Sequence, residues 1–166
     1  VLDGSSGYAS LPSGIVSALN NFTIAAWVKA SDTDSWSRIF DFGTGTTTYM
    51  FMTVNSGSYP RFAITTGGNG SEQQISGTTA FTTGTWHHVA VTLSGSTGIM
   101  YIDGSAVASN TSMTLKPSSL GTTTQNYIGR SEYSSDPYLN GSVDDFRIYS
   151  RALSATEINT LYTSAG

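Results

Sequence analysis

The chain has 166 residues, which is enough for one domain with a sizeable hydrophobic core. Charged residues make up only 11% of it and the formal net charge is −4, so it lacks the concentrated lysine and arginine footprint that nucleic-acid binding requires. The absence of cysteine excludes disulfides, thiolate catalysis and cysteine-ligated zinc, and no apolar run approaches the ~20 residues of a membrane span.

Short segments of apolar residues, separated by Gly, Ser, Thr and Asn, predict β-strands along most of the chain. The segment 22–28 is apolar on both faces, so we expect this strand at the centre of a sheet. Asp103-Gly104 predicts a two-residue hairpin. The predicted strands cover 22–28, 38–42, 49–54, 61–65, 86–93, 99–102, 105–108, 127–128 and 143–149. The polar tracts at 43–48, 66–80 and 109–125 are expected to be loops.

The last segment predicts the only helix. Ser154 and Glu157 have the spacing of a capping box, and Leu153 and Ile158 occupy the positions of a hydrophobic staple. We expect this short helix to lie across one end of the fold. About nine short strands and one helix, with no linker, predict a single domain over residues 1–166: an all-β, two-sheet antiparallel sandwich.

One carboxylate in the last predicted strand draws attention. Regular alternation of side chains places Asp144 on the same face as Phe146 and Ile148. An isolated carboxylate on an apolar face is costly unless something compensates its charge, and a metal ion is one natural compensator. Asp145 would point to the other side, toward solvent or toward Arg147.

Five motifs occur in a distinctive order along nearly the whole chain. They are Leu2-Asp-Gly with Tyr8-Ala-Ser-Leu-Pro12, then Phe22-Thr-Ile-Ala-Ala-Trp-Val28, Thr85-Trp-His-His-Val-Ala-Val91, Tyr101-Ile-Asp-Gly104 and Asn140-Gly-Ser-Val-Asp-Asp-Phe-Arg-Ile-Tyr-Ser-Arg-Ala-Leu-Ser154. Together they resemble the laminin-G-like, concanavalin-A-like lectin/glucanase family. The resemblance implies a β-jelly roll, commonly with one calcium ion where the ends of the chain meet. In bacteria, such domains are often appended to secreted glycoside hydrolases and polysaccharide lyases.

The resemblance also implies which residues would bind calcium. Asp3, in an Asp-Gly-Ser-Ser-Gly loop, and Asp144 come together in this family, and the carbonyl of Gly43 is a further ligand by analogy with related glucanases. Carboxylates and backbone carbonyls are the ligands that calcium prefers, and the ion would be structural. The alternative is that Asp3 caps a turn and that Asp144 accepts backbone hydrogen bonds.

Metal binding by histidine and catalysis both have weak signals. His87 and His88 are strand neighbours and point to opposite faces, so we do not expect them to share an ion. Glycoside hydrolysis usually needs two opposed carboxylates, and sandwich glucanases similar to this fold carry a Glu-x-Asp-x-x-Glu strand, which this sequence lacks. We therefore expect a non-catalytic domain.

Aromatic residues in polar loops are the main candidates for ligand binding. Sugar sites combine an aromatic platform with polar groups that bind hydroxyls. Trp36 lies in a wholly polar segment, whereas Trp27 and Trp86 belong to apolar strands and are expected in the core. The candidate ligand-binding residues are Trp36, Asp41, Tyr59, Arg61, Arg130, Tyr133 and Tyr138. Alternatively, the loop aromatics pack as lids and Asp41 pairs internally with an arginine.

Sequence and resemblance together predict a carbohydrate-binding module, with a structural calcium ion, that targets a linked catalytic domain of a secreted bacterial hydrolase or lyase to polysaccharide. The charge-poor surface favours neutral polysaccharide, although a few arginines could bind a uronate. Three alternatives stay open, and the simplest is a structural spacer that binds no ligand. An adhesion or protein-interaction domain would show a contiguous exposed apolar patch, and a glycoside hydrolase would show two facing carboxylates in a cleft. Neither nucleic acid nor a membrane is an expected partner.

Overall fold

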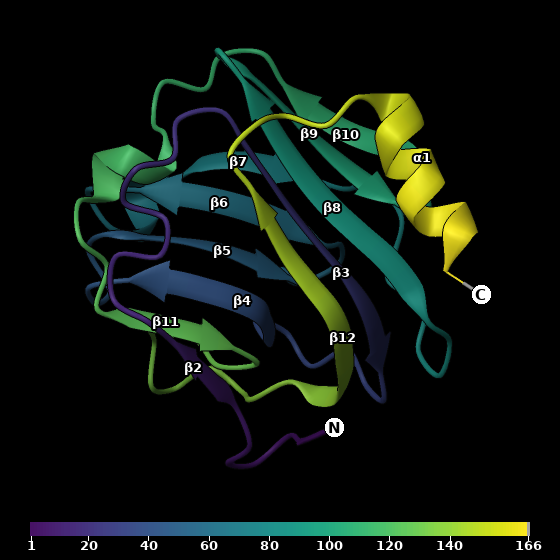
Figure 1. Ribbon diagram of the computed structural model, residues 1–166. Coiled ribbons are helices and arrows are strands. Elements are labelled where there is room, and N and C mark those ends of the chain that lie inside the picture. The colour runs from purple at the N-terminus through teal and green to yellow at the C-terminus, as the bar shows by residue number, and fades with distance from the viewer. Residues whose placement is uncertain (166) are drawn as a thin grey trace.

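The computed structural model describes residues 1–165 as two six-stranded antiparallel sheets packed face to face (Figure 1). In order across the sheet, sheet A contains β1 (Leu2–Asp3), β12 (Asn140–Tyr149), β3 (Phe22–Ala30), β8 (His87–Ser94), β9 (Thr97–Ile102) and β10 (Ser105–Asn110). Sheet B contains β2 (Ala9–Leu11), β11 (Gln125–Ile128), β4 (Arg38–Gly43), β5 (Tyr49–Thr53), β6 (Arg61–Thr65) and β7 (Gln73–Ser76). Two short 3-10 helices, η1 (Asn69–Ser71) and η2 (Pro117–Leu120), and the α-helix α1 (Ala155–Ser164) complete the described part of the chain. The predicted all-β sandwich is confirmed.

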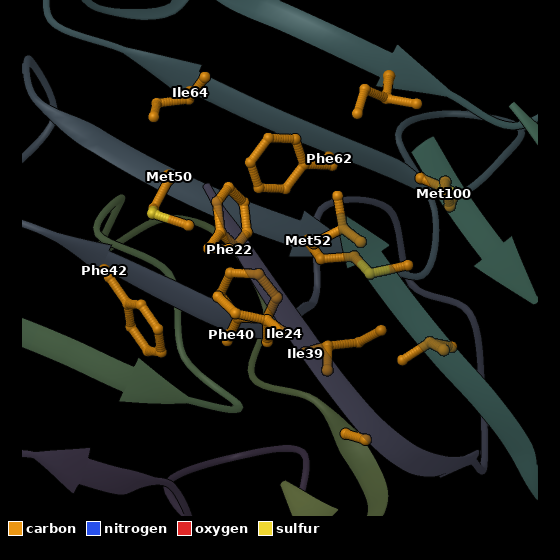
Figure 2. Packing of buried hydrophobic residues seen from close by; sticks show 14 of the residues in the cluster. Phe22, Ile24, Ile39, Phe40, Phe42, Met50, Met52, Phe62, Ile64 and Met100 are labelled. Atoms are coloured by element: carbon orange, nitrogen blue, oxygen red, sulfur yellow. The ribbon is translucent and has the colours of Figure 1, made fainter. Parts of the chain in front are cut away.

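The core lies between the inner faces of the two sheets. Figure 2 shows Phe22 and Ile24 of β3 among side chains from the opposite sheet, including Phe40 and Phe62. The rings of Phe22 and Phe62 lie 6.1 Å apart and join the two layers directly. Each large apolar side chain buried in this way stabilises the fold by roughly 1.5–3 kcal/mol. The alternate residues of the same strands point away from this core and form the outer faces of the sheets.

The short hairpin and the helix cap form as predicted. Asp103 and Gly104 have φ angles of 51° and 79° and link β9 to β10, which is the conformation that an Asp-Gly hairpin turn needs. At α1, the backbone N–H of Glu157 donates to Ser154 Oγ (3.2 Å), and the N–H of Ser154 donates to Glu157 Oε1 (3.1 Å).

The position of α1 differs from the expected one. The helix packs on the outer face of sheet A, beside β10, rather than across one end of the sandwich (Figure 1). Leu153 and Ile158 form a cluster there with Ala25, Ala90 and Tyr101. Small residues in the centre of this face leave room for the helix. In residues 1–165, no helix is long and apolar enough to cross a membrane.

A β-bulge in β12 overturns the expected burial of Asp144. Asp144 pairs with Trp27 and Arg147 pairs with Ala25, so β12 carries one extra residue between these two pairs. Asp145 occupies the bulge with a φ of 50°. The extra residue reverses the alternation, which leaves Asp144 exposed on the outer face while Phe146 packs against the core. Arg147 Nε donates to Asp145 Oδ1 (2.8 Å), as predicted.

The tryptophans expected in the core do not lie there. Trp86 is 42% exposed, because it precedes β8 and takes no part in the pairing of that strand. Trp27 lies on the outer face of sheet A, where its ring is 5.2 Å from that of His88 and 5.8 Å from that of Tyr162. Both indoles therefore belong to the face of the molecule that carries α1.

Candidate functional site

A pocket of about 370 Å³ opens on the outer face of sheet B. It is lined by Trp36, Arg38, Arg61, Asn69, Glu72, Gln74, Tyr133 and Asp136. Beneath it, Tyr49, Phe51 and Ala63 form a small buried cluster, separate from the main core, against which Trp36 and Tyr133 pack. These residues point outward because their neighbours along β5 and β6 fill the core. The pocket is thus built on paired strands, which gives it a rigid floor.

Trp36 is held at the edge of this pocket in an unusual backbone conformation. Its φ of 73° lies in the left-handed region, which a bulky residue rarely adopts and which costs roughly 1–3 kcal/mol. Its N–H donates to the carbonyl of Asn55 (2.7 Å), and the guanidinium of Arg61 lies 5.6 Å from its ring centre. Strain of this kind is typical of functional positions.

Arg38 is a buried cation that connects the pocket to the sheet. It is only 2% exposed. Its Nε donates to Asp41 Oδ2 (3.1 Å), and its Nη2 forms an ion pair with Asp136 Oδ2 (3.2 Å). Its Nη1 donates to the carbonyl of Trp36 (2.6 Å), and the guanidinium stacks 3.9 Å above the ring of Phe51. The sequence prediction left open that Asp41 pairs with an arginine. That pair exists, and Asp41 is fully buried rather than part of the pocket wall.

The rest of the wall offers hydrogen-bonding groups of several kinds. Glu72 accepts hydrogen bonds from the Tyr49 hydroxyl and from Gln74 Nε2, the latter at 3.0 Å. The hydroxyl of Tyr133 donates to the carbonyl of Thr46 (3.2 Å). Arg61 Nε donates to Ser76 Oγ (3.0 Å), whereas within residues 1–165 its two Nη groups and the Asn69 amide have no partner. A ligand with several hydroxyls would find donors and acceptors here.

Two carboxyl groups next to the pocket are buried with unpaired oxygens. Asp41 Oδ1 and both carboxyl oxygens of Glu132 have no hydrogen-bond partner within residues 1–165. Burial raises the pKa of Asp41 to about 7 against the opposing effect of Arg38, and burial together with the charge of Asp41 raises the pKa of Glu132 to about 9. Gly43 leaves space for this carboxyl group, since a Cβ atom there would lie 2.8 Å from Glu132 Oε1. Glu132 is therefore protonated near neutral pH.

The structure divides the predicted ligand-binding residues into groups. Trp36, Arg61 and Tyr133 meet in the pocket. Arg130 and Tyr138 both belong to the segment 129–139, which links β11 to β12, and they lie in a second cluster with two further tyrosines. Tyr59 is 43% exposed in the connection between β5 and β6 and belongs to neither group. The sequence pattern gave no signal for the other pocket residues, which are Arg38, Asn69, Glu72, Gln74 and Asp136.

The residues proposed for calcium come from different strands. Asp3 and Asp144 lie in sheet A, whereas Gly43 ends β4 in sheet B. Asp3 Oδ1 accepts backbone hydrogen bonds from three residues of its own loop, at 2.7 to 3.0 Å, and the carbonyl of Gly43 accepts one from Thr124 (3.1 Å). Among residues 1–165 there is no group of three His, Asp or Glu side chains arranged to hold a metal. Calcium stays a prediction, which calcium titration followed by thermal unfolding would test.

The two adjacent histidines have separate surroundings. His87 bonds through Nδ1 to Asp103 Oδ2 (2.7 Å) and through Nε2 to Thr82 Oγ1 (2.6 Å). These bonds tie the loop before β8 to the β9–β10 turn. His88 lies against Trp27 on the outer face of sheet A, and burial lowers its pKa.

Comparisons with known proteins agree with this fold. The sequence model of the concanavalin A-like lectin/glucanases superfamily, of the laminin-G type, matches residues 3–159. No curated protein matches the sequence significantly. Among solved structures, domain 4 of an extracellular GH43 arabinanase from Geobacillus stearothermophilus, in complex with arabinotriose, matches with a TM-score of 0.82 and 21% identity over 98% of this chain and 75% of that one.

Two further solved structures share the fold at lower identity. The CBM40 domain of the IT-sialidase from Ruminococcus gnavus, bound to α2,3-sialyllactose, has a TM-score of 0.78 and 13% identity over 95% of this chain and 97% of that one. A pentraxin from Limulus polyphemus has a TM-score of 0.66 and 17% identity over 99% of this chain and 81% of that one.

Proposed function

Because the chain belongs to the concanavalin A-like lectin/glucanases superfamily, we propose that it binds an oligosaccharide in the pocket of Trp36. In this proposal the domain is a carbohydrate-binding module of a secreted bacterial glycoside hydrolase or polysaccharide lyase, and it concentrates the linked catalytic domain on polysaccharide. The observation that carries the proposal is the pocket itself, in which an indole and several polar side chains converge on a rigid sheet face.

The chemistry of the pocket suits a sugar. The C–H face of a pyranose or furanose ring packs against an indole. Trp36 stands at the edge of the pocket in its left-handed conformation, with the guanidinium of Arg61 beside its ring. Sugar hydroxyls both donate and accept hydrogen bonds. Arg61 and Asn69 would donate to them, and Glu72 would accept from them. Two neighbours in fold are solved with arabinotriose and with sialyllactose, which supports a saccharide as the ligand class.

The acids of the pocket favour binding over cleavage. Glycoside hydrolysis needs one carboxylic acid to protonate the leaving oxygen and a second carboxylate opposite it. Asp136 is bonded to Arg38 (3.2 Å) and to Ser131 Oγ (2.9 Å), and Glu72 is bonded to Tyr49 and Gln74. Asp136 and Glu72 thus both form contacts with neighbouring side chains of the pocket wall. The two carboxyl groups with raised pKa values, Asp41 and Glu132, do not line the pocket.

The test is calorimetric titration with a panel of neutral and acidic oligosaccharides, using three proteins. Trp36→Asn removes the indole but tolerates the left-handed backbone, so it should remain folded. Trp86→Ala removes an exposed indole from a different part of the surface and is the control. We expect the parent and Trp86→Ala to bind the same sugar, and Trp36→Asn to bind it at least about tenfold more weakly. Equal binding by Trp36→Asn, or no binding of any sugar by the parent, would contradict the proposal.

A further inference from the structure

Arg130, which belongs to the segment 129–139, lies among three tyrosine rings. The carbon of its guanidinium lies 4.8 Å from the ring centres of both Tyr8 and Tyr127 and 5.9 Å from that of Tyr138. Tyr8 and Tyr127 contact each other edge to face at 5.3 Å, and Tyr8 and Tyr138 lie 6.1 Å apart. The rings come from three separate parts of the chain, before β2, on β11 and before β12. We call these four residues the Arg130 cluster.

The polar side-chain atoms of this cluster have no hydrogen-bond or ion-pair partner within residues 1–165. Within residues 1–165, Arg130 forms no hydrogen bond or ion pair, and the hydroxyls of its three tyrosines have no partner either. Each of the other four arginines of the protein donates at least one hydrogen bond to another side chain. Cation–π contacts fix the guanidinium in place, but they leave its five N–H donors free. The cluster is therefore a positioned cation that lacks an anion.

The acid nearest in sequence does not supply that anion. Glu132 interacts electrostatically with Arg130, but no carboxyl oxygen approaches it within ion-pair distance, and burial raises the pKa of Glu132 to about 9. Near neutral pH this carboxyl group is uncharged, so the charge of Arg130 remains uncompensated.

We propose that the Arg130 cluster binds the carboxylate of a uronic acid residue in an acidic polysaccharide. The planar guanidinium matches a carboxylate through two parallel hydrogen bonds. The hydroxyls of Tyr8, Tyr127 and Tyr138 would hydrogen-bond to the same sugar, and Tyr8, which is 41% exposed, offers it an aromatic surface. This inference rests on the proposed function, because it takes the ligand to be a saccharide.

The surroundings favour a sugar acid over an acidic peptide or nucleic acid. The chain has only seven basic residues and a net charge of −4, so it offers one isolated cation here instead of a basic patch. A single carboxylate on an otherwise neutral sugar matches one isolated arginine. The segment 129–139 also supplies Arg130 to this cluster and Tyr133 and Asp136 to the pocket, which makes the two sites neighbours. A glycan chain with neutral and acidic residues could occupy both.

The test compares an oligogalacturonate with its methyl ester, since esterification removes the negative charge of each carboxyl group and adds only a methyl group. Both are titrated calorimetrically into the parent, Arg130→Gln, Arg130→Lys and Trp36→Asn, with thermal unfolding as the check of folding. We expect the parent to bind the free acid at least about tenfold more tightly than the ester. Arg130→Gln should bind the two equally, and Arg130→Lys, which keeps the charge but loses the planar fork, should retain only part of the preference.

The outcomes separate this inference from the proposed function. A parent that does not distinguish acid from ester, or an Arg130→Gln variant that keeps the preference, would overturn the carboxylate site while Trp36-dependent binding of neutral sugars could still hold. A sulfated neutral oligosaccharide forms a further arm, and tighter binding of the sulfated sugar than of the galacturonate would also overturn the assignment. Binding of the free acid that depends on Arg130 but not on Trp36 would support the cluster and show that it binds independently of the pocket, whose own test is the titration with neutral sugars.

Discussion

Arg38 is a buried cation that also lines the pocket. Its guanidinium is surrounded by Asp41, Asp136, the carbonyl of Trp36 and the ring of Phe51, so each face and edge has a partner. The desolvation cost of a buried cation is met only when such partners are complete. The same contacts hold Trp36 in its strained conformation, and we infer that the indole is ready for a ligand before one arrives.

Removal of the Arg38 charge should therefore destabilise the whole domain. Arg38→Met keeps much of the side-chain volume but leaves Asp41 buried without its cation, and we expect a loss of about 3–5 kcal/mol in the free energy of unfolding. Urea denaturation measures this loss. Arg61→Met is the control, because Arg61 is partly exposed and forms one side-chain bond, to Ser76, so its loss should cost at most about 1 kcal/mol. Equal effects of the two changes would refute the role given to Arg38.

The buried acid Glu132 should make stability depend on pH. Its pKa of about 9 in the folded protein lies above its ordinary value, so the folded state holds more protons than the unfolded state between roughly pH 4.5 and 9. Stability is therefore highest below this range and falls as the pH rises through it. Asp41, with a pKa of about 7, contributes in the same direction in the lower part of the range.

We expect the melting temperature to fall by about 5 °C or more from about pH 5 to about pH 9, since each kcal/mol shifts it by roughly 2–4 °C in a domain of this size. In Glu132→Gln, which cannot ionise, most of the fall above about pH 7 should disappear. Thermal unfolding in a series of buffers measures both curves. A parent protein that is as stable at the alkaline end as at the acidic end would show that Glu132 is not buried as described.

At the scale of elements, the outer faces of the two sheets differ: the helix packs on sheet A, and the pocket opens on sheet B. Helix α1 covers part of the outer face of sheet A, where Ala25 and Ala90 let it approach closely. The outer face of sheet B has no α-helix on it within residues 1–165 (Figure 1). Its strands carry Tyr49, Phe51 and Arg61 outward. The position of the helix therefore leaves sheet B as the face that can present a ligand site.

The docking of α1 should depend on one buried side chain and on its cap. Ile158 is fully buried, so Ile158→Ala should cost about 2–5 kcal/mol, whereas Ser154→Ala removes only the cap and should cost about 1 kcal/mol. Chemical denaturation measures both changes. Thr160→Ala, on the exposed side of the helix, is the control and should stay within about 0.5 kcal/mol of the parent. An Ile158→Ala protein as stable as the parent would mean that α1 does not pack on sheet A.

Most of the strands could be predicted because their pattern is local. The strands with continuous apolar or alternating residues, such as β3 and β6, are where the sequence places them. Strand β7 was missed because Ile75 is its only apolar residue, and a single residue shows no periodicity. The bulge at Asp145 could not be predicted either, since it is a property of the pairing between β12 and β3 and reverses the faces expected from alternation.

The candidate site was predicted only in part for a similar reason. Trp36 and Tyr133 were identified because an aromatic residue in a polar segment is unusual. Arg38 stands beside apolar residues, and only its cross-strand position shows that it points into the pocket. Glu72 and Gln74 belong to a tract expected to be a loop, and they join the wall because β7 pairs with β6. Contacts between strands, rather than patterns along one strand, decide which residues meet.

The whole molecule is a sandwich in which one outer face is packed against a helix and the other carries the pocket. The three tryptophans distinguish the two faces. Trp36 lines the pocket of sheet B, whereas Trp27 and Trp86 lie together on a different surface beside Asp144. A sugar bound in the pocket should perturb one indole and leave the other two unchanged, and it should be recovered intact.

The most direct measurement is an NMR titration of the three indole N–H signals with the best-binding oligosaccharide, followed by analysis of the sugar after prolonged incubation. We expect the chemical shift of the Trp36 indole N–H to change saturably and those of Trp27 and Trp86 to stay unchanged. We also expect that no new reducing ends form in the sugar. Shifts confined to Trp27 or Trp86 would place the glycan on the wrong face, and shortened sugar chains would show that the domain is an enzyme.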